Sequence, residues 1–79
     1  MARDIRAIFA VNLRSLREKR GLSQEQLARR ARIDRTYVSA LERGIYSATI
    51  TMVARLAKVL QATPAWMVSE GAKARRGRR

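Results

Sequence analysis

The sequence predicts a small all-α domain of five helices, and three observations support this fold class. Apolar residues recur at intervals of three and four, which is the spacing of residues on one face of a helix. Capping residues precede these stretches, and Gly residues end two of them. A chain of 79 residues has room for one domain. We expect this domain to span residues 1–71, followed by a basic, disordered tail over residues 72–79.

The first predicted helix ends near Arg20, because Gly21 supplies the left-handed conformation that commonly stops a helix. Its apolar face is formed by Ile5, Phe9, Leu13 and Leu16. A second helix begins after Ser23. Ser23 and Gln26 fit a capping box, in which each side chain satisfies a free backbone N–H group. The inner face of this second helix is formed by Leu27, Ala28 and Ala31.

The third predicted helix follows the second through a very tight turn. Only Arg32 and Ile33 separate the second helix from Asp34, which caps the third. A turn this short needs a left-handed residue, so we expect a positive φ at Arg32. The inner face and the stop of the third helix are Val38, Leu41 and Gly44.

Two further helices follow a loop at residues 45–48. Thr49 caps the fourth helix and Thr63 caps the fifth. Pro64 occupies the first position of the fifth helix, where a missing N–H costs nothing. We expect this helix to run from Pro64 to about Ser69. The inner face of the fourth helix is formed by Ile50, Val53, Leu56, Ala57 and Leu60.

The residue composition argues against an enzyme. The chain contains no Cys and no His, so the commonest metal ligands, nucleophiles and general bases are missing. Its 6 acidic residues are scattered along the sequence. We therefore expect no catalytic site, no metal, no cofactor and no small-molecule ligand.

The chain is strongly basic, with 18 Lys and Arg residues, 6 acidic residues and a formal net charge of +12. This charge favours a polyanionic partner, with nucleic acid ahead of an anionic membrane surface. Five basic residues lie in the last seven positions, so the rest of the chain, with 13 basic residues, is basic as well. The tail either adds sequence-independent attraction to DNA or is a solvated end or a remnant of cloning.

No part of the sequence suggests a membrane protein or a secreted one. No apolar run approaches the roughly 18 residues that a membrane span needs. Charged residues interrupt the N-terminal segment, which therefore lacks the pattern of a secretory signal. We expect a cytoplasmic protein with no membrane partner.

Two short helices joined by a tight turn form a helix-turn-helix arrangement. The sequence resembles the Cro/phage-repressor family of DNA-binding domains, which have the lambda repressor-like fold. The resemblance covers Ile8 to about Met67 and rests on NLRSLREKRGLSQEQLARRA, IDRTYVSALERG and MVARLAKVL. The start of the third helix, DRTYVS, is most similar to the controller proteins of restriction–modification systems.

The sequence departs from this family at three places. Arg32 and Gln61 stand where relatives often have Gly, which raises the question of turn geometry at both positions. In the loop after the third helix, many relatives have basic residues and a Pro, whereas this chain has none at residues 45–48. This departure argues against phosphate binding by the loop through charge.

The resemblance implies that the third helix enters the major groove of DNA. With Val38 and Leu41 facing the core, a rotation of about 100° per residue directs Thr36, Ala40 and Arg43 outward, with Arg35 and Ser39 to one side. Arg35 has the fork geometry that binds guanine O6 and N7. The alternative is an ordinary solvated helix face. The residues that we expect at base edges are Arg35, Thr36, Ser39 and Ala40.

Phosphate contacts are expected from helix N-termini and from nearby side chains. In the resembled family, the position of Gln24 holds the DNA backbone, although an exposed glutamine without a role is the alternative. Tyr37 either directs its hydroxyl to phosphate or packs in the core. The complete set of expected phosphate contacts is Ser23, Gln24, Tyr37 and Arg43.

The resemblance also implies an ion pair between Arg17 and Glu42 that ties the first helix to the end of the third. The positions agree with this role, because Glu42 lies beside the inner face of the third helix and Arg17 follows the apolar face of the first. We therefore assign this pair to the scaffold and not to DNA contact.

These features predict a sequence-specific transcription regulator that binds a palindromic operator as a homodimer. Trp66, Met67 and Val68 are three consecutive apolar residues that one helix face cannot bury together, so we expect them in the dimer interface. The alternative for Trp66 or Met67 is that it closes the core. Two other functions stay open: an antitoxin-like protein with a protein partner at its C-terminal helix, and a nonspecific binder driven by charge.

Overall fold

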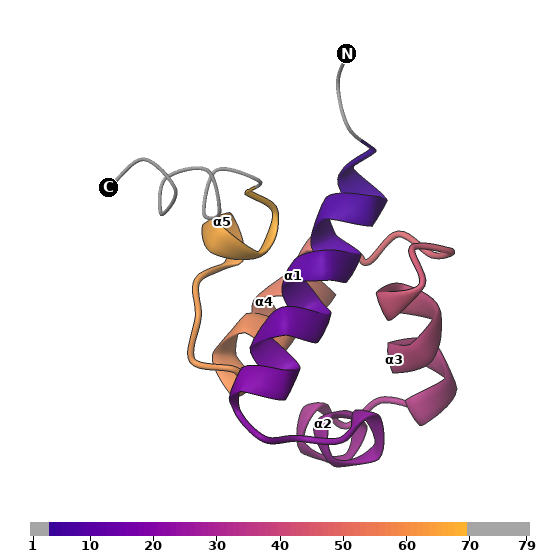
Figure 1. Cartoon of the computed structure of the whole chain (residues 1–79), viewed down its shortest axis with the longest axis vertical. Helices are drawn as coiled ribbons and strands as arrows, with labels where there is room; N and C mark the ends of the chain where they lie inside the picture. Colours follow the sequence, from indigo (N-terminus) through magenta and orange to yellow (C-terminus); the bar gives the residue numbers. More distant parts are fainter. Residues whose placement is uncertain (1–3, 70–79) are drawn as a thin grey trace.

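The computed structural model describes residues 4–69, which form five α-helices and no β-strand (Figure 1). The all-α, five-helix fold class predicted from the sequence is confirmed. The predicted domain limit at residue 71 and the basic tail lie outside the described residues. The helices are α1 (Ile5–Lys19), α2 (Gln24–Ala31), α3 (Arg35–Glu42), α4 (Ile50–Val59) and α5 (Pro64–Met67).

Side-chain caps begin every helix, because the first N–H groups of a helix have no partner within it. The Ser23 hydroxyl accepts from the Gln26 N–H at 3.0 Å, and the Gln26 side-chain oxygen accepts from the Ser23 N–H at 2.8 Å. The predicted capping box is therefore confirmed. The expected caps at Asp34, Thr49 and Thr63 are present as well. Asp4, which the sequence pattern did not single out, caps α1.

All five helices enclose one core, in which α1 packs against α3 and α5, and α2 packs against α3 and α4. In Figure 1, α1 passes between α5 and α3, while α4 lies behind it and α2 crosses below its C-terminal end. All five helices contribute fully buried apolar side chains, and these side chains form one continuous core. The largest of these are Leu13, Leu27, Val38, Leu41, Leu56, Leu60 and Met67.

Two predicted core residues, Ile5 and Ile50, are exposed. Ile5 is 52% exposed and Ile50 is 87% exposed. Each is the first residue of its helix. Because Cβ atoms tilt toward the N-terminus of a helix, a side chain at the first position extends past the neighbouring helices that would cover it. The prediction that both residues face the core was therefore wrong.

The short α5 closes one side of the core. Met67 is fully buried, so the prediction that it contacts a second copy was wrong. The alternative, that Met67 closes the core, is correct. The helix ends at Met67 and not near Ser69. Its end is held by α1, where the Asn12 side-chain amide donates to the carbonyl oxygens of Met67 at 2.8 Å and Ser69 at 3.0 Å. Trp66 is half-buried and Val68 is 38% exposed.

Two turns contain left-handed residues other than Gly. Arg32 has φ 61° and ψ 47°, which confirms the predicted positive φ in the turn between α2 and α3. Gln61, after α4, has φ 58°. Both positions are those where relatives often have Gly. Arg32 and Gln61 therefore adopt the left-handed conformation although neither is Gly. This conformation is disfavoured for both residues, because their Cβ atoms crowd the backbone.

Replacing Arg32 by Gly should stabilise the fold by about 1 kcal/mol, because Gly adopts the left-handed conformation without the Cβ clash. Thermal unfolding followed by circular dichroism measures the change. Arg30→Gly is the matched control, because Arg30 lies within α2 and Gly there should destabilise by about 1 kcal/mol. An Arg32→Gly variant less stable than the parent chain would contradict this account of the turn.

Candidate nucleic-acid interface

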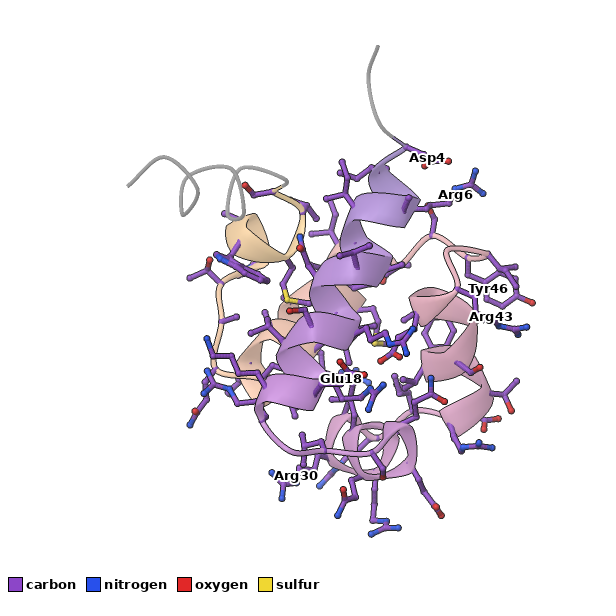
Figure 2. All side chains as sticks on the ribbon, in the orientation of Figure 1. Asp4, Arg6, Glu18, Arg30, Arg43 and Tyr46 are labelled. Carbon is purple, nitrogen blue, oxygen red and sulfur yellow. The ribbon has the colours of Figure 1, made fainter. Side chains whose placement is uncertain are left out.

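The helix α3 has one face in the core and one face in solvent. Val38 and Leu41 have 0% exposure and fix the rotation of the helix about its axis. With these two residues facing inward, Arg35, Thr36 and Arg43 are exposed and Ser39 is half-buried. We call Arg35, Thr36, Ser39 and Arg43 the outer face of α3. Figure 2 shows Arg43 projecting away from the helix on this side.

Ala40 does not belong to the outer face. It is 5% exposed, so the prediction that Ala40 points outward to the bases was wrong. The burial of Ala40 comes from the tertiary packing of α3, which contacts both α1 and α2, and the helical rotation alone does not show it. At the end of the helix, Gly44 has φ 72° and the Ile45 N–H donates to the Ala40 carbonyl oxygen at 3.1 Å.

An aromatic pair joins the returning loop to α3. The ring centroids of Tyr37 and Tyr46 are 6.3 Å apart and the rings are tilted by 46°, within the range of favourable aromatic contacts. Tyr37 is half-buried, which agrees with packing against the loop and leaves part of its side chain accessible. Tyr46 is 56% exposed and lies on the same side of the molecule as Arg43 (Figure 2). Sequence reasoning did not identify Tyr46, because loop residues carry no periodic signal.

The N-terminus of α2 contributes Ser23 and Gln24. Ser23 is exposed, and its hydroxyl oxygen accepts the capping hydrogen bond, which leaves the hydroxyl hydrogen available to another acceptor. Gln24 is half-buried, and its side-chain amide nitrogen donates to Glu42 Oε1 at 3.1 Å. The structure therefore places Gln24 in contact with the last residue of α3.

The predicted ion pair of Arg17 and Glu42 is confirmed and is nearly buried. Arg17 Nε donates to Glu42 Oε2 at 2.6 Å, and Arg17 Nη2 donates to Oε1 at 3.0 Å. The side chains are 11% and 4% exposed. Arg17 Nη1 also donates to the Leu22 carbonyl oxygen at 2.7 Å. The hydrogen bond to the Glu42 carboxylate raises the pKa of Arg17 above its ordinary value, so the guanidinium stays charged at any physiological pH.

Some basic side chains of the described residues are compensated by a nearby carboxylate, and others are not. Arg6, Arg14 and Arg29 are each paired with a nearby carboxylate. Within residues 4–69, neither Arg35 nor Arg43 forms an ion pair with an acidic residue. The outer face of α3 therefore presents two uncompensated positive charges, which suits a polyanion.

Within the described residues, no group of three or more His, Cys, Asp or Glu side chains could hold a metal ion. None of the helices in residues 4–69 is long and apolar enough to cross a membrane.

The chain belongs to the helix-turn-helix family, whose profile matches residues 13–67. With its two helices joined by a tight turn, it is a DNA-binding transcription regulator of the Cro/C1 type.

Among individual proteins, the control protein C.SmaI of Serratia marcescens is 39% identical over 75 residues, which cover 94% of this chain and 89% of that protein. A hypothetical transcription factor of Neisseria meningitidis serogroup B is 44% identical over 57 residues. This match covers 72% of the chain but only 54% of the Neisseria protein, so the chain spans about half the length of that relative.

Solved structures agree with this assignment. The crystal structure of the hypothetical transcription factor NHTF from Neisseria has a TM-score of 0.86 and 34% identity, over 92% of this chain and 84% of that one. The controller protein C.Esp1396I, as a tetramer in complex with its natural operator, has a TM-score of 0.74 and 26% identity, over 84% of this chain and 87% of that one.

Breaking the buried ion pair from one side should destabilise the fold strongly. Arg17→Met or Glu42→Gln is expected to lower the free energy of unfolding by about 3–5 kcal/mol, because an uncompensated polar or charged group stays buried. Urea denaturation measures this change. Arg14→Met is the control, since the Arg14–Glu18 pair is 65% and 58% exposed and its loss should cost about 0.5 kcal/mol or less. Equal effects of the buried and exposed substitutions would refute the scaffold role.

Proposed function

We propose that this regulator binds a palindromic operator as a homodimer and reads each half-site with the outer face of α3 in the major groove. The observation that carries the proposal is the division of α3 into a core face, locked by Val38 and Leu41, and an outer face whose cations form no ion pair within residues 4–69. A rigid polar helix face beside a helix N-terminus suits both base and phosphate contact. Such a regulator works in the cytoplasm with the DNA that it controls.

The residues divide between base edges and backbone. Arg35 is at the first position of α3, and its fork suits guanine O6 and N7. Thr36 and Ser39 offer hydroxyl groups to base edges from the same face. Phosphates are bound from both ends of the motif: Ser23 and Gln24 at the start of α2, and Tyr37 and Arg43 on α3.

The relatives support operator binding as the activity. C.SmaI is named a control protein, and the C.Esp1396I structure contains a tetramer of that controller on its natural operator. The basic chain, with Arg35 and Arg43 in no ion pair among residues 4–69, provides the electrostatic attraction that such binding requires. We therefore propose that the chain is a controller-type regulator that acts on an operator near a gene that it regulates.

Dimerisation supplies the information that one recognition helix lacks. One helix contacts only a few base pairs, which is too little to select one site among the many in a genome. Regulators of this motif solve the problem by two-fold symmetry, which sets two recognition helices about 34 Å apart on one side of the duplex.

The surface that we propose for the second copy is an apolar groove beside α1. Its lining includes the exposed side chains of Ile5, Tyr46 and Val68, with the core residues Phe9 and Val53 below them. Ile50 lies one turn before Val53 on α4 and is 87% exposed. Isolated exposed apolar residues are common, but several around one groove are typical of a contact surface. We therefore keep Val68 in the proposed interface, whereas half-buried Trp66 lines a separate hollow near α5.

Removing Arg35 should change specificity, whereas removing Gln24 should change affinity. Arg35→Ala should lose about 1–3 kcal/mol of binding to the operator and relax preference at one base position. Gln24→Ala should weaken binding to operator and random duplexes alike. A competition assay at physiological salt, with the chain's own upstream promoter DNA against random DNA, measures both effects.

The control for this pair is Arg30→Ala. Arg30 projects from α2 at a different side of the molecule from Arg43 (Figure 2), so it should not affect discrimination. Unchanged discrimination in Arg35→Ala would show that α3 is not the recognition helix. Equal affinity of the parent chain for all duplexes would favour the nonspecific binder.

A charge in the apolar groove should separate the dimer into monomers. Ile5→Asp is suitable because the side chain lines the groove, is 52% exposed and belongs to the first residue of α1, where an acidic residue does not oppose the helix dipole. Analytical ultracentrifugation at micromolar concentration should show a dimer for the parent chain and a monomer for the variant. Val11→Asp, at a 52% exposed position outside the groove, should remain a dimer. A parent chain that is monomeric both free and on its operator would end the dimer proposal.

A further inference from the structure

We propose that Glu42 is a positioning residue that holds the side-chain amide of Gln24 in the orientation needed for phosphate contact. This inference rests on the proposed DNA-binding function. It adds a role for Glu42 beyond its ion pair with Arg17, because the carboxylate connects that pair to the start of α2.

The connection is made at one atom. Glu42 Oε1 accepts hydrogen bonds from Arg17 Nη2 at 3.0 Å and from Gln24 Nε2 at 3.1 Å. Arg17 also donates to the Leu22 carbonyl oxygen, in the turn that leads into α2. The network therefore joins α1, the turn, the first residue of α2 and the last residue of α3.

The chemistry of these groups determines which way the Gln24 amide points. An ionised carboxylate only accepts hydrogen bonds, so the nitrogen end of the carboxamide must face Glu42 and the oxygen end must face away from it. The nitrogen has two hydrogens, and Glu42 uses one of them. The second stays available to a phosphate oxygen, which also only accepts. Without Glu42, the amide would be free to rotate and to present its oxygen to the phosphate, which is repulsive.

The ion pair also makes an acidic residue tolerable near DNA. Arg17 binds both carboxylate oxygens of Glu42, and the Glu42 side chain is 4% exposed. A carboxylate that is buried and neutralised in this way repels a phosphate far less than an exposed one. Because Glu42 is the last residue of α3, the same side chain fixes the phosphate-binding amide relative to the base-reading helix.

A purely structural role for Glu42 gives a different expectation from a positioning role. If Glu42 only stabilises the fold, Gln24→Ala weakens DNA binding by the same factor whether or not Glu42 is present. If Glu42 positions Gln24, the effect of Gln24→Ala disappears once Glu42 is replaced. A double-mutant cycle on DNA affinity separates these two cases.

The cycle uses the parent chain, Gln24→Ala, Glu42→Gln and the double variant, with affinities for operator and random duplexes measured by fluorescence anisotropy. Each affinity is corrected for the folded fraction from circular dichroism at the same temperature. We expect Gln24→Ala to weaken binding by roughly tenfold, the order for one hydrogen bond to a charged group. Glu42→Gln should lose a similar factor, and the double variant should lose no more than either single one.

Arg17→Lys is the matched control, because it weakens the ion pair but keeps both a cation and the Glu42 carboxylate. In that background, Gln24→Ala should still cost roughly tenfold. Independent, multiplicative losses from Gln24→Ala and Glu42→Gln would overturn the positioning role while leaving the proposed function intact. A chain that does not prefer its operator would instead overturn the proposed function.

A measurement on the unmodified chain covers the case in which Glu42→Gln does not fold. Nuclear magnetic resonance of the nitrogen-15-labelled chain follows both side-chain amide protons of Gln24 during titration with operator. The proton bound to Glu42 should keep its chemical shift, and the other should move as the phosphate binds. Similar movement of both protons would contradict the proposal.

Discussion

The buried pair of Arg17 and Glu42 is the interaction on which the DNA-binding motif depends. Neither hydrophobic packing nor the tight turn alone determines how the start of α2 is placed against the end of α3. The guanidinium does so by binding both carboxylate oxygens and the Leu22 carbonyl oxygen at once. A charged pair with 11% and 4% exposure is stable only when such hydrogen bonds replace water. The relative positions of α2 and α3 therefore depend on this network of hydrogen bonds.

Around this network, short helices and tight turns leave little freedom for α3. Residues with positive φ follow α1, α2, α3 and α4, and two of the four are not Gly. The strain at Arg32 and Gln61 is tolerated because the packing on both sides of each turn determines the backbone conformation. Val38 and Leu41 then set the rotation of α3, and the side chains that remain in solvent become the proposed reading surface.

The small size of the domain explains the apolar groove. A small domain cannot cover every apolar side chain, and most of those left exposed here lie at helix starts, in the loop after α3 and next to α5. Ile5 and Ile50 extend beyond the core because of their position at the first turn of a helix. The exposure of Ile5 beside Tyr46 and Val68 gives the proposed second copy a place to bind, close to the loop that follows α3.

The sequence by itself determined the five helices, the caps of α2 to α5, the left-handed Arg32 and the inner face of α3, because these follow from local periodicity and backbone chemistry. The ion pair was implied by family resemblance. Only the tertiary structure decided the burial of Ala40 and Met67, the exposure of Ile5 and Ile50, and the contact of Gln24 with Glu42. Each depends on how the packed helices surround the side chain, which helical periodicity does not contain.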